Sequence, residues 1–275
     1  MTTSPEQTLW PRPELPAENV YGHRKKIAFI LKTVDQRQAA ADRPLRVLDF
    51  GCGSGTTIAQ YILAERFAED GTSLQPIEYW GIDIHDESLE YARRHFSTPI
   101  AHFEKEVPQG LIFDVIIYAD VLEHLDDPAA FLAEHHKQLA SDGVMVASIP
   151  NGYGGFENER RLDRWLHLTP IAKGLLNTYR RLRGRPRPPP PTVPFNLESG
   201  HLVFFTKRLL LTTLSKANLR LGKFQHGTFV GADFSSATIF RLRPLLKLNA
   251  WLADFLPSWA VSTWHFEIHP AGDGR

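Results

Sequence analysis

The sequence has a single cysteine and no long apolar run. With Cys52 alone among 275 residues, an internal disulfide framework is excluded, and this usage is typical of a reducing compartment. No apolar run approaches the roughly 20 residues of a membrane span. Residues 1–16 are polar and interrupted by prolines, unlike a secretory signal. These absences predict a soluble protein of the cytoplasm.

The sequence also lacks an excess of charge of either sign. Its 31 acidic and 31 basic side chains give a formal net charge of zero. This balance argues against a nucleic-acid binder that uses the whole chain, although local basic patches stay open. A chain of 275 residues can bury a substantial core in one domain with additions.

The most informative stretch is residues 46–57, in which a short apolar run leads into a glycine-rich turn. The run up to Phe50 is typical of a buried strand. Gly51, Gly53 and Gly55 follow at a spacing of two, and a helical pattern comes next. Glycine lets the backbone approach a ligand, and the start of a helix offers unpaired N–H groups, so this turn predicts a ligand cradle.

The glycine spacing distinguishes two classes of nucleotide-binding fold. Dinucleotide-binding folds need G-x-G-x-x-G and an acidic residue about 20 positions later. Here the turn reads G-x-G-x-G, Asp49 precedes it, and Asp83, which ends the next strand, comes later than that. The arrangement resembles the class I S-adenosylmethionine-dependent methyltransferases. The resemblance extends over residues 46–150 and includes a Glu-His-Leu motif at 123–125.

The resemblance implies S-adenosyl-L-methionine as the cofactor. Ligands of open α/β sheets bind where the parallel strands end, and a carboxylate there can accept both ribose hydroxyls, as we expect for Asp83. Cys52 is expected to be a small residue beside the ligand rather than a nucleophile. The predicted cofactor-binding residues are Asp49, Gly51, Cys52, Gly53, Gly55, Asp83, Ile84, Ala119 and Asp120.

Alternating strand and helix patterns predict the fold class. Strands are expected near residues 46–50, 77–84, 100–103, 113–118 and 144–149, with helices over 87–96 and 128–138 and a turn at 142–143. This order predicts an α/β fold with a doubly wound, mostly parallel, seven-stranded Rossmann-like sheet and helices on both faces. In the family, strands like those expected near 219–225 and 262–268 form the antiparallel end of the sheet, and a helix like 21–41 covers the cofactor pocket.

Four segments are expected along the chain. They are an extended N-terminal arm over 1–19, a cofactor-binding core over 20–150, a basic and proline-rich lid insertion over 151–200, and a C-terminal part over 201–275 that completes the sheet and the acceptor site. Within the insertion we expect a mobile loop over 151–155, helices over 156–185 and an extended or disordered run over 186–194. Further on, Thr206 is predicted to cap a helix through residue 217, and 242–256 is amphipathic.

Methyl transfer to a hydroxyl needs a group that takes up the proton of that hydroxyl. His124 follows the fourth strand, on the side where the methyl group of the cofactor should point, and His201 follows the insertion. We predict these two histidines as the candidate catalytic bases.

A metal is the alternative at the same place. Asp120, Glu123 and His124 have i, i+3, i+4 spacing, which suits one face of a helical turn, and His201 could add a ligand. Some quinone-biosynthesis O-methyltransferases use a similar acidic-acidic-histidine motif with a metal. However, Asp120-x-x-Glu123 also reads as a capping box that needs no ion. We therefore predict no metal.

The sequence favours a methyltransferase that acts on a small-molecule acceptor at oxygen. The alternatives are transfer to nitrogen or carbon of a lipid-like or sugar substrate, and a non-catalytic module that binds S-adenosylmethionine. No Asn-Pro-Pro-Tyr-like motif follows the fourth strand, so nucleic acid is not expected as a partner. Arginines beside Trp165 and neighbouring leucines make a weak membrane-surface contact a further candidate role of the insertion. The oligomeric state stays open.

Overall fold

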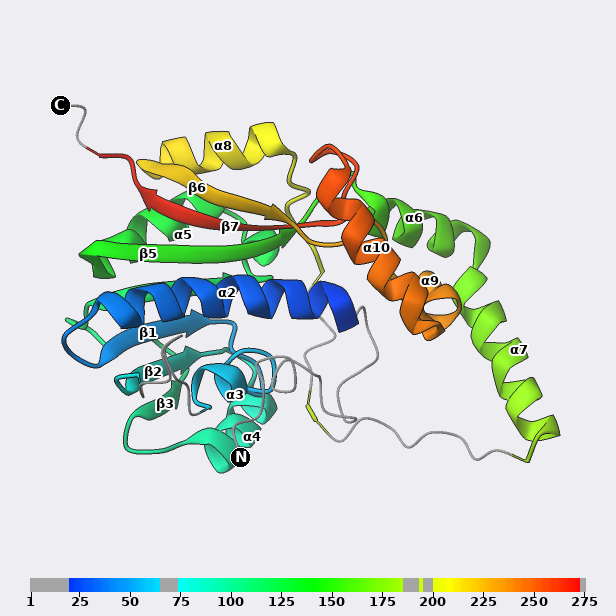
Figure 1. The fold of residues 1–275 in the computed structure, drawn as a ribbon, viewed down its shortest axis with the longest axis horizontal. Helices are drawn as coiled ribbons and strands as arrows, with labels where there is room; N and C mark the ends of the chain where they lie inside the picture. Colours follow the sequence, from blue (N-terminus) through cyan, green and yellow to red (C-terminus); the bar gives the residue numbers. More distant parts are fainter. Residues whose placement is uncertain (1–19, 65–73, 185–192, 195–199, 273–275) are drawn as a thin grey trace.

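The computed structural model describes residues 20–64, 74–184, 193–194 and 200–272. The strands among them form one central sheet (Figure 1). The strands are β1 (Leu45–Phe50), β2 (Ile77–Ile82), β3 (Ala101–Glu104), β4 (Phe113–Ala119), β5 (Leu139–Pro150), β6 (Leu219–His226) and β7 (Thr263–Pro270). Their order in the sheet is β3-β2-β1-β4-β5-β7-β6. The predicted arm over 1–19 and most of the proline run lie outside the described residues.

The sheet is parallel except at one side. Strands β1 to β5 pair in parallel, whereas β7 runs antiparallel to both β5 and β6. The predicted mostly parallel sheet with an antiparallel end is therefore confirmed. Strand β4 is buried from Phe113 to Tyr118, as expected for a central strand that is covered on both faces. The parallel strands end at a common edge, here called the carboxyl edge.

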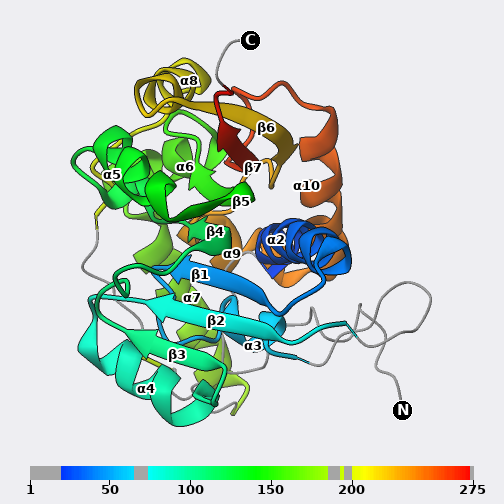
Figure 2. The same ribbon diagram turned by 90° about the vertical axis from the view of Figure 1, so that its left-hand side faces the viewer.

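Helices cover both faces of the sheet (Figure 2). Helix α2 (Val20–Ala40), the single turn α3 (Ala59–Ile62) and α4 (Asp86–Phe96) share one buried cluster with the strands. Helices α5 (Pro128–His135) and α8 (Lys207–Lys216) share the other. Each fully buried aliphatic side chain in these clusters stabilises the fold by about 1.5–3 kcal/mol relative to exposure.

Helix α2 is fastened to the C-terminal part of the chain by polar contacts. Lys25 Nζ donates to Asp254 Oδ1 at 2.6 Å and to the carbonyl of Ala250 at 3.1 Å, both in α10 (Arg243–Phe255). Thr33 Oγ1 donates to Glu267 Oε1 of β7 at 3.0 Å. These contacts hold α2, at the beginning of the described chain, against α10 and β7 near its end.

Two local expectations in the core are wrong or incomplete. Residues 142–143 are part of β5 (Leu139–Pro150) rather than a turn before it, and the pairing with β4 shifts register there, from Phe113↔Leu139 to Val115↔Val144. A Cβ on Gly143 would lie 2.8 Å from the Leu139 side chain, so glycine is needed there for packing within the strand. Helix α5 ends at His135 and is continued by a short 3-10 turn, η2 (His136–Gln138). Thr206 caps α8 as predicted, accepting from the Leu209 N–H at 3.1 Å.

Four helices gather at the carboxyl edge, on the right in Figure 1. They are α6 (Gly155–Leu166), α7 (Leu168–Leu182), α9 (Asp233–Ala237) and α10, here called the end helices. The sequence predicts α10 and a helical segment over 156–185. It does not predict α9, the 3-10 turn η3 (Ile239–Arg241), or the break between α6 and α7. That break falls at His167, whose φ of +50° is left-handed. None of the helices within the described ranges has the length and apolar composition of a bilayer-spanning segment.

The loop over 151–155 is tightly packed, so the prediction of a mobile loop is wrong. Asn151 is buried, and its Nδ2 donates to the carbonyls of Trp259 at 2.9 Å and Val261 at 2.8 Å. A Cβ on Gly154 would lie 2.1 Å from the Val261 carbonyl oxygen. The glycines that suggested mobility are instead required for close approach of two backbones.

We expect Gly154→Ala to destabilise the protein, because the added methyl group would overlap a backbone carbonyl. Overpacking of this kind typically costs about 1–3 kcal/mol. Gly174→Ala is the matched control, since Gly174 lies within α7 and no described atom is within 4 Å of its Cβ position. The control should stabilise the helix by about 0.5–1 kcal/mol. Urea denaturation measures both, and equal midpoints for the two variants would contradict the packing argument.

Candidate active site

The three glycines after β1 have different tasks. Gly51, Gly53 and Gly55 all have left-handed backbones, with φ of +66°, +55° and +76°. A Cβ on Gly51 would lie 2.7 Å from Val121, and a Cβ on Gly55 would lie 2.7 Å from Phe96. At Gly53 no described atom is within 4 Å of the Cβ position. Gly51 and Gly55 are therefore needed for packing, whereas Gly53 borders open space that a ligand could occupy.

Asp83 follows β2 at the carboxyl edge and organises the glycine turn. Its Oδ2 accepts from the Gly53 N–H at 2.7 Å, and its Oδ1 accepts from the His85 N–H at 2.8 Å. Each carboxylate oxygen can accept more than one hydrogen bond, so both keep capacity for ligand hydroxyls. The next side chain, Ile84, is 83% exposed and could cover a flat ring system. These positions are compatible with the predicted ribose contact of Asp83 and with Ile84 as a cofactor-binding residue.

Asp49 is a buried carboxyl under the same turn. Burial raises its pKa to about 7, although the hydrogen bond from the Tyr79 hydroxyl at 2.5 Å opposes this shift. Its Oδ1 is buried and has no partner among the described residues. A cationic ligand group beside Asp49 would supply that partner and favour the ionised carboxylate.

Only the backbone of Cys52 contributes to the glycine turn. Its N–H donates to the Ile82 carbonyl at 3.1 Å, and its side chain belongs to the buried core beside Gly81. Burial raises the pKa of the thiol well above its usual range, which agrees with the expectation that it is not a nucleophile.

Asp120 follows Ala119 at the end of β4 and joins three elements. Its Oδ2 accepts from Lys26 Nζ of α2 at 2.5 Å, and its Oδ1 accepts from Ser148 Oγ of β5 at 2.7 Å. Desolvation would raise the pKa of Asp120, but the charge of Lys26 and these hydrogen bonds lower it. The capping-box interpretation is wrong, because Val121 precedes the 3-10 turn η1 (Leu122–His124) and Asp120 is engaged elsewhere.

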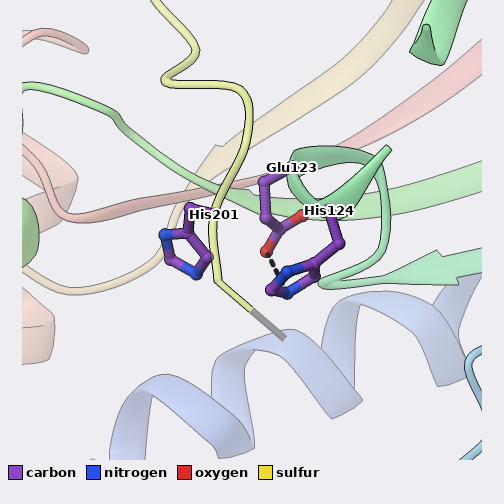
Figure 3. Close-up of side chains that lie close together, drawn as sticks. All are labelled: Glu123, His124 and His201. Atoms are coloured by element: carbon purple, nitrogen blue, oxygen red, sulfur yellow. Dashed lines mark ion pairs between the residues drawn. The ribbon is translucent and has the colours of Figure 1, made fainter. Parts of the chain in front are cut away.

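His124 and His201 meet at the carboxyl edge, with ring centroids 5.0 Å apart (Figure 3). His124 Nδ1 faces the Gly200 carbonyl at 3.0 Å, and His201 Nδ1 faces Glu157 Oε1 at 2.7 Å. Both partners can only accept, so Nδ1 carries the proton in each ring. A neutral imidazole then has its lone pair on Nε2. The structure thus brings together two predicted bases that lie far apart in the sequence.

The buried carboxyl of Glu123 lies beside the two imidazoles. Burial and the charge of Asp120 raise the pKa of Glu123 well above its usual range, and its Oε2 has no partner among the described residues. Glu123, His124 and His201 offer ligand atoms within 4.8 Å of one another, a spacing that a metal ion could also bridge. This set differs from the predicted one, which also contained Asp120, because Asp120 is not among the three residues.

Two site residues were missed from the sequence. Lys26 belongs to a run of basic side chains on α2 and is not distinguishable there from its neighbours. Glu157 lies in the first turn of α6, 44 residues before His201. Its burial at 2% exposure is the signal that identifies it, and only the structure provides that signal.

Comparisons with known proteins identify the family of this chain. A family model described as a methyltransferase domain matches residues 21–221, more than half of the chain. The ubiquinone biosynthesis O-methyltransferase of Neisseria meningitidis serogroup A is 33% identical over 140 residues, which are 48% of this chain and 51% of that protein. The Pseudomonas aeruginosa PAO1 protein of the same name is 30% identical over 128 residues, covering 43% and 49%. The matches span about half the length of these relatives.

Solved structures share the fold at low identity. An S-adenosylmethionine-dependent methyltransferase from Clostridium acetobutylicum has a TM-score of 0.51 and 10% identity, with 91% of this chain and 92% of that chain covered. The [4+2]-cyclase SpnF has a TM-score of 0.50 and 13% identity, with 89% and 82% covered. These likenesses show the fold alone. Because the cyclase is named for a different reaction, the function has to be argued from the residues of the site.

We expect Asp83→Asn to weaken binding of S-adenosylmethionine, because charge-assisted hydrogen bonds to the ribose would be lost. The loss should be about 2–3 kcal/mol, or roughly 30–150-fold in Kd. Asp86→Asn is the matched control, since Asp86 pairs with Lys105 on the surface. Titration calorimetry measures the affinities, and urea denaturation tests whether the Gly53 and His85 contacts survive. Equal affinities for the two variants would overturn the role of Asp83.

Proposed function

We propose that this chain, which belongs to the class I S-adenosylmethionine-dependent methyltransferase family, transfers a methyl group to an oxygen atom of a small-molecule acceptor. The observation that supports transfer to oxygen is the His201 imidazole, because the Glu157 carboxylate holds the proton on Nδ1 and leaves the lone pair of Nε2 for another proton. His124 lies beside it, with its own Nε2 4.0 Å from Glu123 Oε1. A hydroxyl acceptor must lose its proton during transfer, and neutral imidazole can take up that proton near physiological pH.

The sheet register supports a place for His124 near the glycine turn. Phe50 of β1 pairs with Ile82 of β2 and with Tyr118 of β4. The glycine turn and the segment after β4 therefore leave the sheet side by side, and Val121 lies against Gly51. A ligand over Gly53 would thus be next to η1, which carries His124 and Glu123.

S-adenosylmethionine, when bound, supplies an electrophilic methyl group on a sulfonium cation. The residues around Gly53, Asp83 and Asp49 would bind and orient this cofactor. His201 Nε2 would then accept the acceptor hydroxyl proton as the oxygen–methyl bond forms and the sulfur–methyl bond breaks, with the sulfur leaving as a neutral thioether. We assign the proton to His201 rather than His124, because a carboxylate partner stabilises imidazolium better than a backbone carbonyl does.

We infer that the acceptor is a phenolic hydroxyl on an apolar molecule. The relatives named as ubiquinone biosynthesis O-methyltransferases, which match over about half of their length, support this class of acceptor. Of the two alternatives, cofactor binding without catalysis would give no role to a base beside the site, and the name of the relatives favours oxygen over nitrogen or carbon. Turnover of catechols and phenols with labelled S-adenosylmethionine tests the proposal directly.

We expect His201→Gln to lower kcat by roughly 10²–10⁴-fold while leaving the Kd for S-adenosylmethionine unchanged, as for loss of a general base. His124→Gln is the matched variant and should cost less. Steady-state kinetics on a catechol and calorimetry give the two readouts. Normal turnover of the His201 variant would exclude it as the proton acceptor, and loss of wild-type activity on chelation would favour a metal.

The end helices support a second proposal, contact with an anionic membrane surface. Large apolar side chains are exposed along them, with Trp165 at 77% and Trp259, which follows α10, at 75%. The other members on α6, α7 and α10 are Leu162, Leu166, Ile171, Leu175, Tyr179, Leu182, Leu248, Trp251 and Phe255. Exposed basic side chains lie among those of α6 and α7 at Arg160, Arg164, Lys173, Arg181 and Arg183. Tryptophan, leucine and arginine together suit the boundary between lipid headgroups and acyl chains.

We expect the protein to sediment with vesicles that contain phosphatidylglycerol and to be released by salt, because each basic side chain near the surface contributes about 1 kcal/mol. Combined Trp165→Ala and Leu175→Ala should weaken this binding. Leu211→Ala on α8 is the control, since Leu211 is also exposed, at 45%, but lies outside the end helices. Absence of binding even at low salt would leave the end helices as an acceptor-site cover only.

A further inference from the structure

We propose that Glu157 is the positioning residue for His201, and that helix α6 thereby takes part in assembling the catalytic site. The inference deepens the proposed function and rests on it. Glu157 is assigned no contact with the acceptor or the cofactor. Its role is to hold one ring nitrogen of His201, which directs the other nitrogen toward the acceptor.

The contact between the two side chains is short and protected. His201 Nδ1 lies 2.7 Å from Glu157 Oε1, and the two side chains are 15% and 3% exposed. A carboxylate oxygen in this position accepts the Nδ1 proton, which fixes the tautomer with the lone pair on Nε2. It also keeps the ring in one orientation beside His124. A base that is fixed before the acceptor arrives avoids the entropy cost of ordering it during the reaction.

Helix α6 provides a favourable place for a buried negative charge. Glu157 is the third residue of a 12-residue helix, so its carboxylate lies near the positive end of the helix dipole. Arg160 is one turn later, with its Nη1 3.8 Å from Glu157 Oε1 and a side chain that is 45% exposed. The nearer and less exposed partner is His201, so the imidazole is the group that the carboxylate orients.

Helix α6 is held by contacts on two sides, and these contacts fix the position of Glu157. Arg161 Nη2 donates to the Gly152 carbonyl at 3.0 Å, at the base of the insertion. Glu159 accepts from the Ser235 N–H at 2.7 Å and from the Ser235 hydroxyl at 2.8 Å, which joins α6 to α9. A movement of α6 away from the carboxyl edge would therefore withdraw the partner of the base.

The test compares Glu157→Gln with Glu159→Gln in the full chain. Glu159 lies on the same helix and makes partly buried hydrogen bonds to α9, so its variant reports loosening of α6 alone. With a weakly acidic phenol, Glu157→Gln should lower kcat by roughly 10–100-fold, part of a general-base contribution, while acceptor KM and cofactor Kd stay within about twofold. With a nitrophenol that is already ionised, the loss should shrink toward wild type, because no proton needs to be removed.

A second readout does not depend on turnover. The ring ¹⁵N chemical shifts of His201 report which nitrogen carries the proton, and they should change in Glu157→Gln but not in Glu159→Gln. Full kcat of Glu157→Gln with the weakly acidic phenol would overturn the inference. So would equal losses in both variants, or unchanged ring shifts in Glu157→Gln.

The experiments distinguish failure of the proposed function from failure of this inference. If wild type methylates no hydroxyl acceptor, or if His201→Gln turns over normally, the general-base role is lost whatever Glu157 does. The tautomer shift in Glu157→Gln can still be measured in that case. If a chelator abolishes wild-type turnover and changes the His201 ring shifts, a metal occupies the site and the proton-acceptor version is overturned.

Discussion

The candidate site depends on the ion pair between Lys26 and Asp120. This pair joins the cover helix α2 to the end of β4, and Ser148 adds β5 through the same carboxylate. Asp120 has a φ of +60°, which a non-glycine residue adopts only where its surroundings compensate the strain. The bend directs the chain from β4 into η1, so the same contact that fastens the helix also determines where Glu123 and His124 lie.

Sequence patterns predict the parts of the molecule that local physics determines. The glycine turn, the buried strands and the Thr206 cap each follow from neighbouring residues, and the structure contains them. The loop over 151–155 shows the limit of such reasoning. Its glycines indicate mobility by composition, but the backbone carbonyl against Gly154 comes from Val261, more than a hundred positions later.

The same limit applies to the site. His124 and His201 could be singled out as chemically capable side chains, whereas their approach depends on how the insertion folds back. Glu157 and Lys26 could not be found, because their roles come from burial and from partners on other elements. Asp120 illustrates the converse error. Its spacing to Glu123 fits a helical turn, but the chain has not yet entered that turn at Asp120.

Helices α6 and α7 differ in how strongly burial constrains their sequences. Thr169 is its only buried residue, whereas α6 buries Glu157 and is joined to α9. Substitutions along α7 therefore remove little apolar area from the core and should cost little unfolding free energy. The surface of α7 can therefore change at little cost in stability, whereas changes in α6 and in the sheet would disturb buried contacts.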